Sequence, residues 1–234
     1  MHSSESSKTW GTLDVVFALA GITAGVVLTR ALGVGLSGTV GWYNAAVMTV
    51  LYLFFLAVVL LFSVVKYGRP LSELGFRKFR PVRVIWLATA WWLAVRAVIL
   101  VYSLLITSLA GLFGAKPPTG TVSTVPRIFG PGWTGFALAV LVAVIIGPVI
   151  EEIFFRGFMY PAFKRVFGVW PAIIISSVIF GVFHADPWLM APIALMGVAL
   201  AYLYEKEGTL AAPIAFHALN NLVSVIIVYT LVLK

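Results

Sequence analysis

A small set of ionisable or hydrogen-bonding side chains lies within long apolar segments, and these side chains are the candidates for chemistry. They are Arg96, Glu151, Glu152, Arg156, His184, His217, Asn220 and Asn221. Each such group costs free energy in an apolar environment unless it has a partner or a function. Carboxylates and imidazoles can accept and return protons, and carboxamides can donate hydrogen bonds to a developing oxyanion. The set therefore suits general acid–base chemistry.

The segment GPVIEEIFFRG, which begins at residue 147, predicts an ion pair and a separate carboxylate. On a helix Glu152 and Arg156 lie at positions i and i+4, so they share one face and can pair. Glu151 is rotated by about 100° from Glu152 and points elsewhere without a local cation. Such a carboxylate suits a general base. The alternative is that both glutamates lie at the cytoplasmic end of a span and meet water and lipid head groups.

Two further segments carry imidazoles. In FGVFH, Phe180 and His184 share one helix face, and His184 is either a catalytic group or a hydrogen-bonded packing residue at a helix end. In FHALNN, His217 and Asn221 share a face at i and i+4. They offer two N–H donors for an oxyanion, or they form hydrogen bonds between helices. Asn220 points about 100° away from Asn221 on the same helix.

Together the three segments resemble the CPBP family of CAAX proteases and bacteriocin-processing enzymes, also called the Abi family. GPVIEEIFFRG, FGVFH and FHALNN follow one another in this order on successive apolar segments, and they span residues 147–221. Members of this family are intramembrane glutamate-dependent endopeptidases, and they include the type II CAAX prenyl endopeptidases. The resemblance implies a peptide or protein substrate, either a prenylated C-terminal tail or an unmodified peptide or membrane-protein segment.

The resemblance also implies roles for six residues. The catalytic residues are Glu151, His184, His217 and Asn221. The first two activate a water molecule, and the last two donate hydrogen bonds to the tetrahedral oxygen. Glu152 and Arg156 form a supporting ion pair, and neither a metal nor a cofactor is implied.

Other classes of function fit the same residues. A metal-dependent membrane hydrolase could use Glu151, His184 and His217 as ligands, since two histidines and one carboxylate suit zinc. The sequence has no HExxH segment, which counts against this class. A non-proteolytic immunity or scaffold protein of the membrane is a second alternative. A transporter with a buried proton relay is a third.

The composition requires a membrane-embedded fold for these residues. The chain has 234 residues, of which 62% are hydrophobic and 10% charged, against roughly 45–50% and 25% in soluble domains. The apolar runs are much longer than the roughly 10-residue strands of a membrane barrel. We therefore expect an all-α transmembrane helical bundle of seven to eight spans, forming a single domain over residues 1–234. Cysteine is absent, which excludes thiol nucleophiles.

The apolar runs predict where the spans lie. A polar tail, residues 1–12, precedes runs at 13–32, 42–65, 84–113, 133–160, 170–183, 188–204 and 210–233. Pro161, with Lys164 and Arg165, is expected to end the fourth run. The fifth run has 14 residues, and its length of about 21 Å is too short to cross a core of about 30 Å unaided. A split segment there would make the count eight.

The net charge of +8 predicts membrane topology rather than nucleic-acid binding. Six cations lie in one polar connection: Lys66, Arg69, Arg77, Lys78, Arg80 and Arg83. An excess of Lys and Arg marks cytoplasmic loops. With the amino terminus inside, seven alternating spans put eleven cations, including Arg156, on the cytoplasmic side and four outside. We therefore expect a multi-pass protein of the cell membrane whose amino terminus and active-site motif face the cytoplasm.

Arg96 interrupts the third apolar run. It lies 12 residues beyond Val84, about 18 Å into the span. At that depth an arginine needs a partner. The expected partner is a backbone carbonyl or Glu152 inside the bundle, and the alternative is the C-terminal carboxylate of a substrate.

Overall fold

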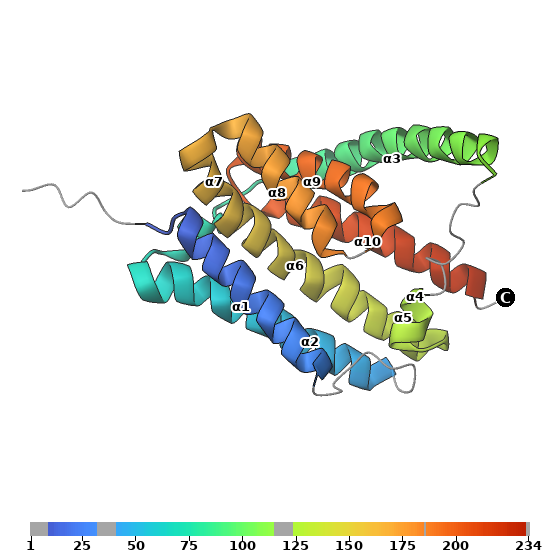
Figure 1. The fold of residues 1–234 in the computed structure, drawn as a ribbon, viewed down its shortest axis with the longest axis horizontal. Helices are drawn as coiled ribbons and strands as arrows, with labels where there is room; N and C mark the ends of the chain where they lie inside the picture. Colours follow the sequence, from blue (N-terminus) through green and yellow to red (C-terminus); the bar gives the residue numbers. More distant parts are fainter. Residues whose placement is uncertain (1–8, 32–40, 115–123, 185, 233–234) are drawn as a thin grey trace, which may run out of the picture.

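The computed structural model describes residues 9–31, 41–114, 124–184 and 186–232, and within these ranges it contains helices and no strand. Most of the predicted polar tail lies outside the described residues, as do Lys8, Lys116, Lys234 and the side chain of Arg30. The helices pack side by side as a bundle (Figure 1). The prediction of an all-α fold is confirmed.

The first half of the chain forms α1 (Thr12–Ala31), α2 (Gly41–Leu60), which continues as the π-helical η1 (Leu61–Val65), the 3-10 turn η2 (Leu71–Leu74), α3 (Pro81–Leu112) and α4 (Thr124–Phe129). One continuous helix then contains α5 (Gly132–Ala139), the π-helical η4 (Val140–Ile146), α6 (Gly147–Glu152), the π-helical η5 (Ile153–Met159) and α7 (Tyr160–Phe167). The last three helices are α8 (Val169–Phe183), α9 (Pro187–Glu207) and α10 (Ala211–Val232).

The long apolar helices confirm a multi-pass membrane protein. Five described helices are long and apolar enough to cross a membrane, namely Gly41–Val65, Pro81–Leu112, Gly132–Phe167, Pro187–Glu207 and Ala211–Leu231. Two shorter apolar helices, Thr12–Leu28 and Val169–Phe183, complete the predicted order of seven apolar segments. Because α8 has only 15 residues, whereas α1 has 20, the prediction of seven to eight spans depends on how α8 crosses.

One end of the bundle gathers the basic connection. Lys66 lies 2.5 Å from Asp14 at the start of α1, and Arg83 at the start of α3 lies 2.7 Å from Glu207 at the end of α9. These pairs join the polar ends of four helices, as alternating spans require. Arg156 does not belong to this end, because its side chain is 1% exposed inside the bundle. The predicted count of eleven cytoplasmic cations is therefore too high by one. The orientation of the bundle stays a prediction.

The glutamate motif lies near the middle of the continuous helix Gly132–Phe167. The expectation that Pro161 ends this helix is wrong, because the helix continues to Phe167 and stops at Gly168, whose φ is 81°. The N–H of Tyr160 bonds the carbonyl of Phe155, five residues back. Pro161 therefore follows the point where the wide π-helical turns end and opens α7, a position where its missing N–H is tolerated.

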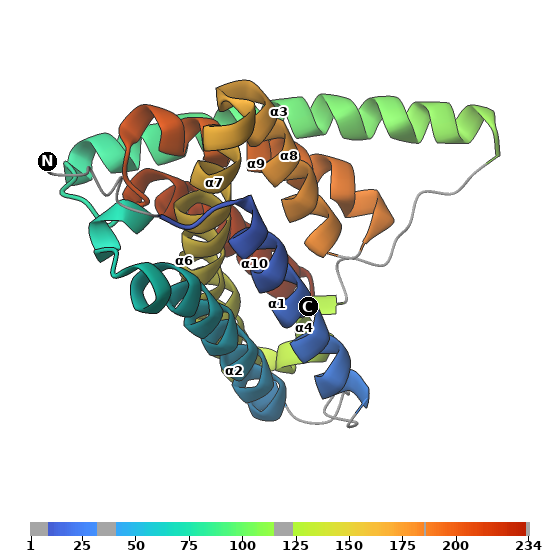
Figure 2. The same ribbon diagram turned by 60° about the vertical axis from the view of Figure 1, so that its left-hand side comes forward.

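The motif-bearing helix is surrounded by its neighbours. All seven residues of η5 are buried, and Figure 1 shows α6 between α1 and α2 on one side and α8 and α9 on the other. In contrast α3 lies at the periphery and exposes apolar side chains such as Leu93 and Leu104, as a lipid-facing helix does. Its second half extends away from α8 and α9 (Figure 2). The core thus holds the two glutamates, while α3 bounds the bundle.

Candidate active site

Glu152 and Arg156 form the predicted ion pair in the centre of the bundle. Nη1 of Arg156 lies 2.9 Å from Oε1 of Glu152, and the two side chains are 1% and 0% exposed. The prediction from the i, i+4 spacing is confirmed. The alternative that both glutamates meet water at the end of a span is wrong, because Glu152 is fully buried near the middle of its helix.

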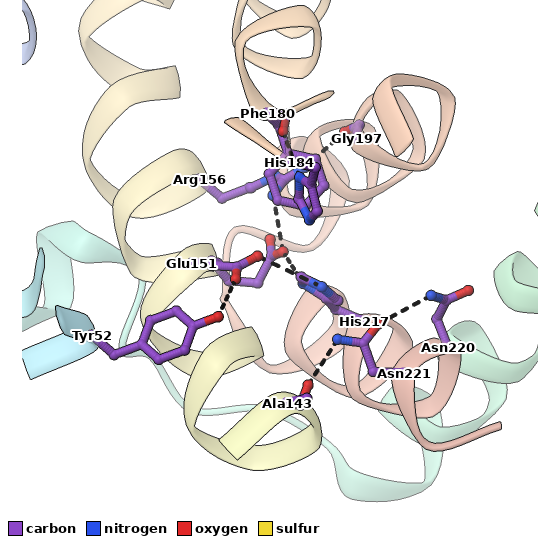
Figure 3. Close-up of polar contacts among 11 residues, drawn as sticks. Tyr52, Ala143, Glu151, Arg156, Phe180, His184, Gly197, His217, Asn220 and Asn221 are labelled. Carbon is purple, nitrogen blue, oxygen red and sulfur yellow. Dashed lines mark hydrogen bonds and ion pairs between the residues drawn. The ribbon is translucent and has the colours of Figure 1, made fainter. Parts of the chain in front are cut away.

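Arg156 also fixes the neighbouring helices around the pair. Its Nη2 donates to the carbonyl oxygen of Gly197 in α9 at 3.1 Å. Its guanidinium lies 4.5 Å from the ring centroid of Phe180 in α8, where the face of an aromatic ring attracts a cation. One buried arginine therefore joins η5 to α8 and α9 (Figure 3).

His217 of α10 lies between the two glutamates. Its Nδ1 is 2.9 Å from Oε1 of Glu152, and its Nε2 is 3.8 Å from Oε2 of Glu151. The carboxylate paired with Arg156 is an acceptor, so Nδ1 of His217 carries the proton. In the neutral ring Nε2 then has a lone pair directed toward Glu151 (Figure 3). Glu152 therefore fixes both the tautomer and the orientation of His217.

Glu151 has one satisfied and one free oxygen. Oε1 accepts a hydrogen bond from the hydroxyl of Tyr52 in α2 at 2.8 Å. Oε2 is buried and has no hydrogen-bond partner among the described residues. Tyr52 was not predicted from the sequence, and the only signal for it is a phenol inside the apolar α2. Glu151 forms no ion pair with Arg156 among the described residues, and its nearest imidazole contact is with His217.

His184 lies at the end of α8 and takes no part in the contact between Glu151 and His217. Its Nδ1 lies 2.8 Å from the carbonyl oxygen of Phe180, so Nδ1 donates and Nε2 keeps a lone pair. Its ring packs edge-on against Phe180 with centroids 4.9 Å apart, and Phe180 packs in the same way against His217 at 5.7 Å. The predicted shared face of Phe180 and His184 is confirmed. No hydrogen bond between His184 and Glu151 occurs among the described residues.

Asn221 is held by a carbonyl that the Gly-Pro dipeptide leaves free. In η4 the N–H of Gly147 bonds the carbonyl of Val142, five residues back. In this register the donor for the next carbonyl, that of Ala143, would be Pro148, which has no N–H. Nδ2 of Asn221 supplies the missing donor at 2.8 Å. A carboxamide has two N–H groups, so the second one can still bind a substrate.

Asn220 is not directed away from its neighbour as expected. Its Nδ2 donates to Oδ1 of Asn221 at 3.2 Å, and its own Oδ1 accepts from Nη2 of Arg96 at 2.6 Å. The expected partners of Arg96, a backbone carbonyl or Glu152, are therefore wrong. Its second contact is the hydroxyl of Ser224 at 3.2 Å. The predicted residues of α10 thus connect to α3.

A cavity of about 530 Å³ lies next to these groups, between α3, α9 and α10. The polar residues that face it include Arg96, His184, His217, Asn220, Asn221 and Ser224. Glu151 is not among the lining residues. Figure 3 shows it on the far side of His217, and its side chain is 16% exposed. A ligand in the cavity therefore meets His217 before it meets Glu151.

The proposed metal ligands are not assembled as a metal site. Among the described residues, no group of three or more His, Asp or Glu side chains is arranged so that it could hold a metal ion. His184 bonds the helix backbone, and His217 bonds Glu152 through Nδ1. The ligand set Glu151, His184 and His217 would need rearrangement to close around one ion.

Comparison with known proteins identifies the same part of the chain. Residues 133–223 match the family model for "Type II CAAX prenyl endopeptidase Rce1-like". The chain is also 37% identical over 84 residues to the "Putative membrane peptidase YdiL" of Bacillus subtilis (strain 168). That match covers 36% of this chain and 34% of the relative, so the two share about a third of their length. No solved structure shows significant similarity to the chain.

We predict that Glu152→Gln destabilises the protein by about 3–5 kcal/mol, because Arg156 loses its charged partner in a fully buried site. The matched control is Glu73→Gln, since Glu73 forms an i, i+4 pair with Arg69 in which the side chains are 32% and 23% exposed. A pair at that exposure contributes about 1 kcal/mol or less. Denaturant unfolding of the purified proteins in detergent measures both values, and equal losses would contradict the assigned role of the pair.

Proposed function

Because residues 133–223 match the family model for type II CAAX prenyl endopeptidases of the Rce1-like kind, we propose that the protein is an intramembrane endopeptidase of the CPBP family. The observation that carries the proposal is the pair of free acceptors, Oε2 of Glu151 and Nε2 of His217, 3.8 Å apart beside a cavity. Two buried acceptors at this separation need donors between them. A water molecule has two O–H groups and meets that need.

Glu151 is the general base in this proposal. Tyr52 holds one of its oxygens and leaves Oε2 to take a proton from the water. His184 contributes from the cavity wall, where its Nε2 can accept the second O–H of the water when that O–H turns from His217 toward the cavity, while the first stays on Glu151. Both residues take the roles that the family resemblance implies.

The tetrahedral oxygen is stabilised from α10. Asn221 donates its second N–H, because the first is held by Ala143. His217 has no N–H to offer at Nε2 while its ring is neutral, so the donor role implied by the resemblance requires a second proton. Glu151 can supply this proton after it has taken it from the water, since Oε2 lies next to Nε2. The resulting N–H then points toward the developing oxyanion.

The reaction balances with groups that the chain provides. Water loses a proton to Glu151 and forms a bond to the carbonyl carbon of the scissile peptide. When the tetrahedral intermediate collapses, the carbon–nitrogen bond breaks and the proton passes through Glu151 to the leaving amine. The products are a carboxylate and an amine. No metal or cofactor takes part in these steps.

The proposal extends to substrate and location. The substrate is a peptide or protein segment, lipidated or not, that reaches the cavity from the bilayer or its surface. We propose that residues 1–234 form one membrane-embedded domain of the cell membrane. Its basic end and amino terminus face the cytoplasm, because Lys and Arg accumulate at the inner face.

We predict that Glu151→Gln lowers turnover by at least about 100-fold and leaves the fold intact, because the amide keeps the shape but cannot accept a proton. The assay incubates the purified protein in detergent with prenylated and unprenylated peptides and maps the products by mass spectrometry. Glu73→Gln is the matched control, since Glu73 pairs with Arg69 outside the site. Near wild-type turnover of Glu151→Gln would refute the base assignment, and a wild-type protein without any cleavage would favour a scaffold.

We predict that peptide cleavage survives exhaustive treatment with chelators. The proposed water is held by carboxylate, imidazole and carboxamide groups, which need no metal ion for these contacts. The measurement compares turnover before and after chelation with the zinc content of the same samples. One zinc per chain, with activity lost on its removal and restored on its return, would favour the metal-dependent hydrolase instead.

A further inference from the structure

Arg96 is a charged residue in the middle of a membrane helix. It is the sixteenth of the 32 residues of α3, so about 22 Å of helix separates it from each end. The residues around it, from Leu93 to Leu100, are otherwise apolar. An arginine at such a depth is costly, and it marks a functional site unless a structural partner neutralises it.

The described residues do not neutralise Arg96. Its two hydrogen bonds go to neutral groups, Oδ1 of Asn220 at 2.6 Å and Oγ of Ser224 at 3.2 Å. No Asp or Glu in the described ranges forms an ion pair with it. Arg156, Arg83 and Arg69 differ in this respect, since each pairs with a glutamate. The charge of Arg96 therefore lacks a counter-charge from the described residues.

Part of the Arg96 guanidinium is also free to bind. Both of these hydrogen bonds use Nη2, and a guanidinium has five N–H donors. Nε is buried and has no hydrogen-bond partner, and the described residues accept no hydrogen bond from Nη1. Because Arg96 lines the 530 Å³ cavity together with His217 and Asn221, a ligand there can reach the part of the guanidinium that faces the cavity.

We propose that Arg96 binds the C-terminal carboxylate of the peptide substrate and thereby selects chains with a free C-terminus. This inference rests on the proposed peptidase function. A carboxylate supplies the missing negative charge and two acceptors that match the planar fork of an arginine. Lipid head groups are the other common anions at a membrane, but they lie at the surface, about 22 Å of helix away from this residue.

Arg96 of α3 contacts α10 at a level that fits a substrate whose C-terminus lies close to the scissile bond. Its partners Asn220 and Ser224 lie three and seven residues after His217, which is about 4.5 and 10.5 Å along the helix axis. An extended peptide covers about 3.3–3.6 Å per residue. A carboxylate held by Arg96 therefore lies within about one to three residues of a carbonyl at His217.

The test measures binding separately from cleavage. The probes are fluorescent decapeptides in matched pairs, one with a free carboxylate and one with a C-terminal amide, each with and without a farnesylated cysteine near the C-terminus. A third probe has a C-terminal amide and an aspartate at the penultimate position. Fluorescence anisotropy gives their affinities for Glu151→Gln protein in neutral detergent, with Arg96 intact or changed to Gln. Arg83→Gln is the matched control, because Arg83 is on the same helix but binds Glu207 outside the cavity.

With Arg96 intact, we expect the free acid to bind about tenfold or more tightly than the amide, as a hydrogen-bonded charge pair would produce. Arg96→Gln should abolish this preference, and Arg83→Gln should keep it. Arg96→Lys retains the positive charge, so it should restore part of the preference and show that the loss is not caused by misfolding.

Three results would overturn the assignment. The free acid and the amide could bind with equal affinity or show no saturable binding, or the preference for the acid could survive Arg96→Gln. The third result is that the amide with the penultimate aspartate binds as tightly as the free acid. None of them depends on turnover. If the wild-type protein binds the free acids tightly through Arg96 but cleaves none of them, the carboxylate site stands and the proposed peptidase activity fails.

Discussion

The buried ion pair between Glu152 and Arg156 is the interaction on which the site depends. Neither charge has access to water, so each must be satisfied by the other and by neighbouring polar groups. Arg156 contacts Gly197 and Phe180 on two other helices, and Glu152 holds His217. Because each charge must be satisfied, the pair fixes the arrangement of four helices around it. It also orients His217 so that Nε2 faces Glu151.

The helix that carries this pair is adapted to it by two π-helical segments. They flank the six residues of α6 and bring Glu151 and Glu152 to the centre of the bundle. The wide register of η4, together with Pro148, leaves the carbonyl of Ala143 to Asn221. Irregular backbone of this kind often marks functional sites. In an apolar environment it is tolerated because neighbouring side chains satisfy the freed groups.

The sequence predicts the parts of this site that depend on one helix at a time. The i, i+4 pair, the separate direction of Glu151 and the shared face of Phe180 and His184 all follow from helical geometry and agree with the structure. Contacts between helices could not be predicted in the same way. The bond from Tyr52 to Glu151 depends on packing that no local spacing encodes. The apolar pattern of the sequence likewise did not predict that the helix continues past Pro161 after a π-helical segment.

Glu152 fixes His217 with its proton on Nδ1, so that a lone pair on Nε2 faces Glu151. Nitrogen-15 NMR of protein labelled at histidine measures this tautomer directly, with His217 identified by the signal lost in His217→Ala. We expect a protonated Nδ1 in the wild-type protein and the loss of this single tautomer in Glu152→Gln. A wild-type His217 with its proton on Nε2, or a tautomer that Glu152→Gln does not change, would contradict it.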